Sequence, residues 1–228
     1  DVPERHFLDE TDVEAVLAPS PFAYGASGAA APAWATVREM ERLARHGYSY
    51  VFLPQAFGPF PATPASREFG RALRSAALVC AREPESCAHV AGIAGDLGDR
   101  LTVFPDFTIG LPGTPSAAAR WNVDRRSALL IPNIHMQGER NSDATWHSAY
   151  LPLLCSLARQ LADLGFVPRI LNHEGEADAA LCESLRAATG GAEVITETDP
   201  RALKGIIGAA GLVVCSRYHG CVSALAQG

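Results

Sequence analysis

Side chains that can do chemistry are densest in the run Ser216-Arg217-Tyr218-His219, which follows the apolar, strand-like residues 212–215 and opens a helical pattern. At the start of a helix, backbone N–H groups and the helix dipole attract an anion, and a guanidinium can bind carboxylate or phosphate through two parallel hydrogen bonds. An imidazole beside that anion can move a proton near neutral pH. The run predicts an anion site with an acid or base next to it. The alternative is a surface ion pair and a capping histidine.

Polar residues also follow other apolar segments, and ligands of parallel α/β proteins bind where strands end. These residues are Gln55 and Gly58 after 48–53, Arg82 after 77–81, Asp106 after 101–104, Asn133 and His135 after 128–131, and His173 and Glu174 after 167–171. Each group has a simpler interpretation as a turn or a helix cap. His173 and Glu174, with Asp178 four residues further on, are an acid–base couple, a nucleotide-binding loop or a turn.

These residues must be positioned by alternating apolar and amphipathic segments, a pattern typical of parallel α/β sheets. Strands are expected at 13–18, 48–53, 77–81, 101–104, 128–131, 167–171, 193–196 and 212–215, and helices at 34–46, from about 66, and at 83–93, 144–164, 177–188, 200–209 and 219–226. The Pro- and Gly-rich residues 111–115 suggest a linker. We therefore expect two Rossmann-like domains, 1–113 and 114–228, whose parallel sheets face a cleft, with both ends of the chain truncated.

The composition limits the class of protein. The chain has 228 residues, 48% of them hydrophobic, which is enough for a buried core. A net charge of −6 argues against nucleic acid as the main partner. No apolar run reaches the roughly 18–20 residues of a membrane span, and no signal peptide opens the sequence. The six cysteines form no CxxC pair, so we expect reduced thiols, a cytoplasmic protein and no zinc site.

Four motifs, taken in order, resemble those of the polysaccharide pyruvyl transferase family. They are Gln55-x-x-Gly58-Pro59-Phe60, Arg82-Glu83-x-x-Ser86, Asp106 five residues before Leu111, and Arg217-x-His219 before a helix. Their order and spacing match from about residue 13 to residue 228. By contrast, GxGxxG after a strand, GxxxxGK[ST], GxSxG and HExxH are absent, which disfavours dinucleotide, P-loop, serine-hydrolase and zinc-protease chemistry.

The resemblance implies a GT-B-like pair of domains that transfers pyruvate from phosphoenolpyruvate onto two sugar hydroxyls, forming a ketal and releasing phosphate. It assigns Arg217 and His219 to the donor-binding and catalytic motif, and Arg82 to an earlier arginine of the family. The sequence departs from the family pattern after the first strand of the second domain. Relatives often carry an arginine there, whereas this chain has Asn133 and His135.

Phosphoenolpyruvate is trianionic near neutral pH, so its site requires guanidinium groups and helix N-termini. We expect Arg217 and His219 to be catalytic, with His173 and His135 as second choices for proton transfer. The expected substrate-binding residues are Arg82, Ser216, Tyr218, Gln55, Gly58, Asn133, His135, His173 and Glu174.

Beyond phosphoenolpyruvate as donor, neither a cofactor nor a metal ion is expected. The expected partner is a saccharide acceptor, free or linked to lipid or nucleotide, and the expected location is the cytoplasm, including the inner face of the membrane. Two alternatives remain open: a nucleotide-sugar glycosyltransferase or epimerase of the same architecture, and a non-catalytic relative that binds an anionic sugar.

Overall fold

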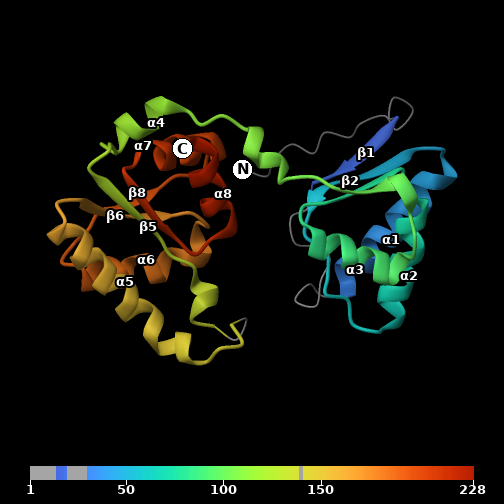
Figure 1. The fold of residues 1–228 in the computed structure, drawn as a ribbon, viewed down its shortest axis with the longest axis horizontal. Helices are drawn as coiled ribbons and strands as arrows, with labels where there is room; N and C mark the ends of the chain where they lie inside the picture. Colours follow the sequence, from blue (N-terminus) through green and yellow to red (C-terminus); the bar gives the residue numbers. More distant parts are fainter. Residues whose placement is uncertain (1–13, 20–29, 139–140) are drawn as a thin grey trace, which may run out of the picture. The chain divides into compact units, whose positions relative to one another are not determined.

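The computed structural model describes residues 14–19, 30–138 and 141–228 (Figure 1). The chain divides into two compact units, of which the first ends at Phe107 and the second is Thr108–Gly228. Each unit contains a four-stranded sheet in which every strand pair is parallel. The predicted α/β class with two Rossmann-like sheets is therefore confirmed. The first expected strand, 13–18, is observed from residue 15, and residue 13 lies outside the described residues.

The first unit has the strand order β1-β2-β3-β4, with helices between successive strands. Its elements are β1 (Ala15–Ala18), α1 (Ala30–Arg45), β2 (Ser49–Gln55), α2 (Pro64–Ser75), β3 (Leu78–Ala81), α3 (Pro84–Ala94) and β4 (Leu101–Val103). All three helices contribute to one hydrophobic cluster, at whose centre Phe52 of β2 meets Phe57 and Phe69 edge-on, with ring centroids 5.8 Å and 6.1 Å away.

The second unit has the strand order β7-β6-β5-β8. Its elements are α4 (Pro115–Arg120), β5 (Ser127–Ile131), α5 (Thr145–Asp163), β6 (Val167–Asn172), α6 (Glu176–Ala188), β7 (Val194–Thr196), α7 (Pro200–Ala209), β8 (Leu212–Cys215) and α8 (Tyr218–Gln227). The first strand in sequence, β5, lies between β6 and β8. The loops that follow β5, β6 and β8 are consequently neighbours at the carboxyl edge of this sheet.

Helices cover both faces of this second sheet (Figure 1). Side chains alternate across β5: Leu129 and Ile131 pack in one cluster with α4 and α7, and Leu130 packs in another with α5 and α6. Every residue of β5 is buried, as its unbroken apolar sequence predicts. A rigid central strand thus holds the loops that follow it.

Some element bounds agree with expectation residue for residue and others do not. Helix α7 and strand β8 have the predicted limits, and most other elements differ by a few residues. Helix α4 was not expected, because it begins at Pro115, inside the segment predicted as a linker. The backbone N–H of Thr114 donates to the carbonyl of Arg201 at 2.8 Å, which ties this segment to α7.

Candidate functional site

Chemistry-bearing side chains gather at the carboxyl edge of each sheet, and the larger group lies in the second unit. Arg217 is the residue directly before α8, and its backbone is extended. Its side chain therefore lies at the N-terminus of the helix. Gly220, in the first turn of α8, is needed for close packing, since a Cβ there would lie 2.5 Å from Sγ of Cys215. The start of α8 is therefore pressed against the end of β8.

The guanidinium of Arg217 is held by a buried carboxylate. Its Nε donates to Oδ2 of Asp178 at 2.9 Å, and its Nη2 donates to Oδ1 of the same residue. Asp178 is fully buried in the first turn of α6, and its Oδ1 also accepts from the backbone N–H of Ile134 at 2.9 Å. One carboxylate thus connects the loop after β5, the helix after β6 and the loop after β8.

A second carboxylate lies near the other end of the same guanidinium. Oε2 of Glu174 is 3.5 Å from Nη1 of Arg217, and the Glu174 side chain is 54% exposed. The Arg217 side chain is 11% exposed, so most of its surface is covered while one part remains open to solvent. The sequence predicted an arginine whose bidentate fork is available to substrate, whereas in the structure one edge of that fork is occupied by Asp178.

His173 lies beside these charges. Burial lowers the pKa of its imidazole below 6.5, Arg217 and the neighbouring His219 lower it further, and Glu174 and Asp178 act in the opposite direction. Among the residues that the structure describes, none hydrogen-bonds its buried Nδ1. This histidine is neutral at pH 7, and its pKa responds to the charges of Glu174, Arg217 and Asp178 around it.

A set of hydrogen bonds joins the loops after β5 and β8. The Asn133 amide Nδ2 donates to the carbonyl of Ser216 at 2.9 Å, and the hydroxyls of Ser216 and Tyr150 are hydrogen-bonded to each other. The backbone N–H of Asn133 donates to the Tyr150 hydroxyl at 3.1 Å, and burial raises the pKa of that phenol. Asn133 and Ser216 therefore fix the geometry of the two loops, and the substrate contact expected of them stays a prediction.

The remaining predicted residues of this unit surround the same edge. His219 occupies the first turn of α8, and its ring lies edge-on to that of Tyr218, which is 42% exposed. His135 lies in the short turn after β5, where its backbone N–H donates to Oδ1 of Asn133 at 3.0 Å. Cys215 packs beneath this edge, and burial raises the pKa of its thiol to about 12, so it supplies no thiolate at neutral pH.

The first unit holds a separate group at the ends of β2, β3 and β4. Arg82 is an ion-pair partner of Glu83 at 3.0 Å and of Asp106 at 3.9 Å, and its side chain is only 6% exposed. Ser86 donates to Glu83 and accepts from the backbone N–H of Phe57 at 2.7 Å. This network ties the Arg82-Glu83-x-x-Ser86 motif to the loop after β2.

The structure of the loop after β2 shows why the motif has glutamine at position 55 and glycine at position 58. Gln55 is fully buried and donates from Nε2 to the carbonyls of Ala18 and Leu53, each at 3.2 Å. Gly58 has φ +77°, and a Cβ there would lie 2.5 Å from the ring of His89, so only glycine fits. Nδ1 of His89 is 2.8 Å from the Phe57 carbonyl and supports the same loop. Gln55 and Gly58 shape the edge of the sheet.

Sequence reasoning missed two residues of the second unit as members of the site. Tyr150 carries no signal of its own within a long amphipathic helix. Asp178 was noticed only as the residue four positions after Glu174, and the spacing could not reveal that it pairs with Arg217. Within residues 14–19, 30–138 and 141–228, no group of three His, Cys, Asp or Glu side chains is placed to hold a metal ion.

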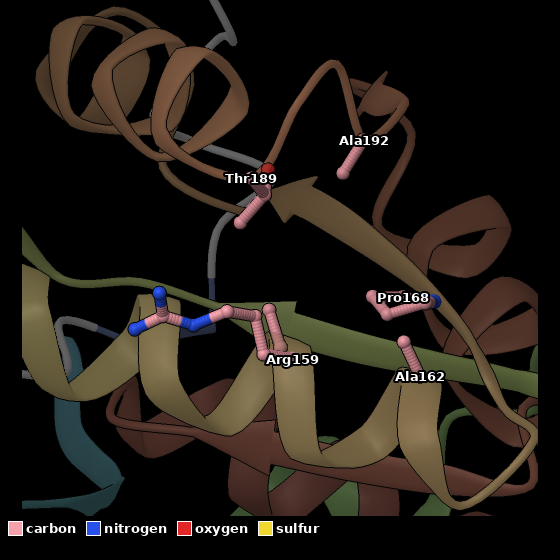
Figure 2. A pocket seen from close by; sticks show the side chains of 6 residues that line it. Arg159, Ala162, Pro168, Thr189 and Ala192 are labelled. Atoms are coloured by element: carbon pink, nitrogen blue, oxygen red, sulfur yellow. The ribbon is translucent and has the colours of Figure 1, made fainter.

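A hollow of about 190 Å³ lies elsewhere on the second unit, between the second half of α5, the start of β6 and the loop after α6 (Figure 2). It is lined by Ala158, Arg159, Ala162, Pro168, Thr189 and Ala192. Since Pro168 belongs to the amino end of β6, this hollow is at the edge of the sheet opposite Arg217 and is not part of the site.

Comparison with known proteins gives one family. The sequence profile of the family described as polysaccharide pyruvyl transferase matches residues 12–228. No curated protein matches the chain. The family match spans both units and includes the motifs on both sheet edges. The chain therefore belongs to the polysaccharide pyruvyl transferase family.

Proposed function

We propose that this protein transfers pyruvate from phosphoenolpyruvate to two hydroxyls of a sugar, forming a ketal and releasing phosphate. The observation that carries the proposal is the placement of Arg217 and His219 at the start of α8, on the carboxyl edge of a parallel sheet, in a chain of this family. Helix N–H groups and a guanidinium suit the carboxylate and phosphate of this donor.

The reaction requires three proton movements. The methylene carbon of phosphoenolpyruvate gains a proton while one sugar hydroxyl attacks the adjacent carbon and loses its own. The C–O bond to phosphate then breaks, and the second hydroxyl attacks the same carbon and gives its proton to the departing phosphate. The two hydroxyl protons thus balance the one gained by carbon and the one carried by phosphate.

We assign the proton delivery to His219, which follows Arg217 by two residues in the proposed anion site. His173 suits the opposite task, because burial keeps its imidazole neutral, and a neutral imidazole accepts a proton from an attacking hydroxyl. Tyr218 is exposed beside His219, and we assign it to the binding of the acceptor. His135 remains the second choice for either transfer.

We assign the acceptor side to residues 1–113 and the donor side to residues 114–228. In the first unit, Arg82 acts through its ion pairs, and Gln55 and Gly58 shape the loop after β2. A polysaccharide precursor in the cytoplasm, including one carried by a lipid at the inner face of the membrane, is the acceptor class. The described part of the chain has no helix that is long and apolar enough to span a membrane.

The test is release of inorganic phosphate from phosphoenolpyruvate in the presence of a panel of saccharides, with mass spectrometry of the saccharide product. A product heavier by one pyruvyl ketal supports the proposal. Tight binding of a nucleotide sugar without phosphoenolpyruvate turnover would instead indicate a glycosyltransferase or epimerase. Saccharide binding with no turnover of either donor would indicate a binding protein.

A further inference from the structure

The two carboxylates on Arg217 differ in almost every respect that matters for ligand exchange. Asp178 is fully buried, contacts Nε and Nη2, and accepts a third hydrogen bond from Ile134. Glu174 is 54% exposed and approaches Arg217 at Nη1, at 3.5 Å. A guanidinium has one edge formed by Nε and one terminal nitrogen and another formed by both terminal nitrogens.

Displacing Asp178 would leave a buried carboxylate and a backbone N–H without their partners, which is costly. Displacing Glu174 returns an exposed carboxylate to water, and exposed ion pairs contribute little. An incoming anion therefore binds Arg217 at the lowest free-energy cost through the edge that Glu174 now faces.

We infer that Asp178 is a positioning residue that permanently holds the Nε edge of Arg217, and that Glu174 is an exchangeable counter-ion whose place on the outer edge is taken by an anionic group of the substrate. The inference rests on the proposed function in naming phosphoenolpyruvate as that substrate. Asp178 sets the direction in which Arg217 presents its outer edge, the one formed by Nη1 and Nη2, and Glu174 competes with the donor for that edge.

The two carboxylates offer a matched pair of substitutions, because each substitution removes one negative charge beside Arg217. Glu174→Gln removes the competitor, so the KM for phosphoenolpyruvate should fall about two- to fivefold, the scale of an exposed ion pair. Asp178→Asn keeps the size of the side chain but replaces one of the two oxygens that accept from Arg217 with an amide NH2, which can only donate. The KM should then rise about tenfold or more, the scale of a lost hydrogen bond to a charged group. A simple charge effect would lower the KM in both variants.

A measurement on the unaltered protein covers the case in which Asp178→Asn does not fold, which a melting curve would reveal. The NMR signal of the Arg217 Nε–H, assigned by its loss in Arg217→Lys, should be protected in the free protein and keep its chemical shift at saturating phosphoenolpyruvate. The Glu174→Gln variant should show the same Nε–H shift, since Glu174 does not contact that nitrogen. A large shift of the Nε–H on donor binding would show that the donor takes the Asp178 edge, and the inference would be wrong.

Calorimetry with phosphoenolpyruvate and with inorganic phosphate separates this inference from the proposed function. If pyruvyl transfer occurs but both substitutions shift the KM in one direction, the inference fails and the function stands. If both anions bind with opposite effects of the two substitutions but no pyruvyl transfer occurs, the function fails and the inference stands for Arg217 as an anion site. If neither anion binds, both fail.

Discussion

At Arg217, the proposed function requires one guanidinium to pair with Asp178 and with a donor anion at the same time. A lysine ammonium keeps the charge but cannot pair bidentately with Asp178 and present a second planar edge. We expect Arg217→Lys to lower kcat/KM for phosphoenolpyruvate about ten- to hundredfold, from the worth of hydrogen bonds to charged groups. The control is Arg186→Lys, at an exposed arginine of α6 that pairs only with Glu183 among the described side chains. Unchanged kinetics in Arg217→Lys would place this arginine outside the donor site.

His219 is the second residue whose chemistry can be isolated. His219→Gln retains a hydrogen-bonding side chain in the first turn of α8 but has no titratable proton. We expect its kcat to fall about 100-fold, the usual scale of acid–base catalysis, with a much smaller change in KM. His219→Ala should be similarly inactive, and melting curves of both variants should match the parent protein. Near-full turnover of the glutamine variant would move the proton transfer to His173 or His135.

Some site candidates can be chosen from the sequence because the residues that mark them are close together in the chain, whereas others are paired with residues far away in the chain. Arg217 and His219 stand two positions apart, directly after an apolar segment, so position along the chain was enough to select them. Asp178 lies 39 residues before Arg217, and Tyr150 lies 66 before Ser216. Their pairing exists only because β5 lies between β6 and β8, and no spacing in the sequence encodes that strand order.

At the scale of elements, the start of α8 is positioned by contact with the end of β8. Gly220→Ala would place a methyl group 2.5 Å from Sγ of Cys215, so the helix start must move, and Arg217 and His219 with it. We expect a loss of roughly 1–3 kcal/mol in stability, typical of overpacking, together with a lower kcat. Thermal melting and phosphate-release kinetics measure the two effects.

A matched glycine and a compensating change make this prediction sharp. Gly92 lies in α3, and a Cβ there would meet no atom of a neighbouring element within 4 Å, so Gly92→Ala should stabilise the protein by roughly 0.5–1 kcal/mol through helix propensity. In a Cys215→Ala background, Gly220→Ala should cost much less than it does alone. An equal cost in both backgrounds would mean that Cys215 is not what limits the approach of α8.

Elements with strong local signals were predicted well. Helix α7 begins after Asp199, whose side chain accepts a hydrogen bond from the backbone N–H of Arg201. Its first residue is Pro200. Both residues favour the start of a helix, so the sequence nearby encodes where α7 begins. Helix α4 carries the same kind of signal in Thr114 and Pro115, but the glycine and prolines around it resemble a linker. Close packing on α7 decides its conformation: a Cβ on Gly205 would lie 2.0 Å from the Thr114 carbonyl oxygen.

At the scale of the whole molecule, each unit carries its own core and its own polar edge. The first unit buries Arg82 and Asp106 at the ends of β3 and β4, and the second buries Asp178 beside Arg217. Buried charges of this kind cost free energy unless they are paired. The stability of the protein is therefore coupled to the protonation of the groups that surround its site.

His173 makes that coupling measurable as a dependence of stability on pH. Burial, together with the electrostatic influence of His219 and Arg217, lowers the pKa of its imidazole in the folded protein below 6.5, the ordinary value that the unfolded chain keeps. As the pH falls below about 6.5, the unfolded chain takes up a proton that the folded protein does not, so stability is lost until the pH reaches the lower folded pKa. Above that range this contribution is constant.

We therefore expect the melting temperature of the parent protein to fall more steeply between pH 7.5 and pH 5 than that of His173→Gln, which has no such proton to bind. Glu174→Gln supplies the opposite control, because the Glu174 carboxylate raises the pKa of His173. Without that carboxylate the folded pKa drops further, and the loss of stability should continue to a lower pH. Parallel melting curves for the parent and His173→Gln across this range would show that the imidazole is not held in its neutral form by the fold, and the assignment of His173 as a base would lose its physical support.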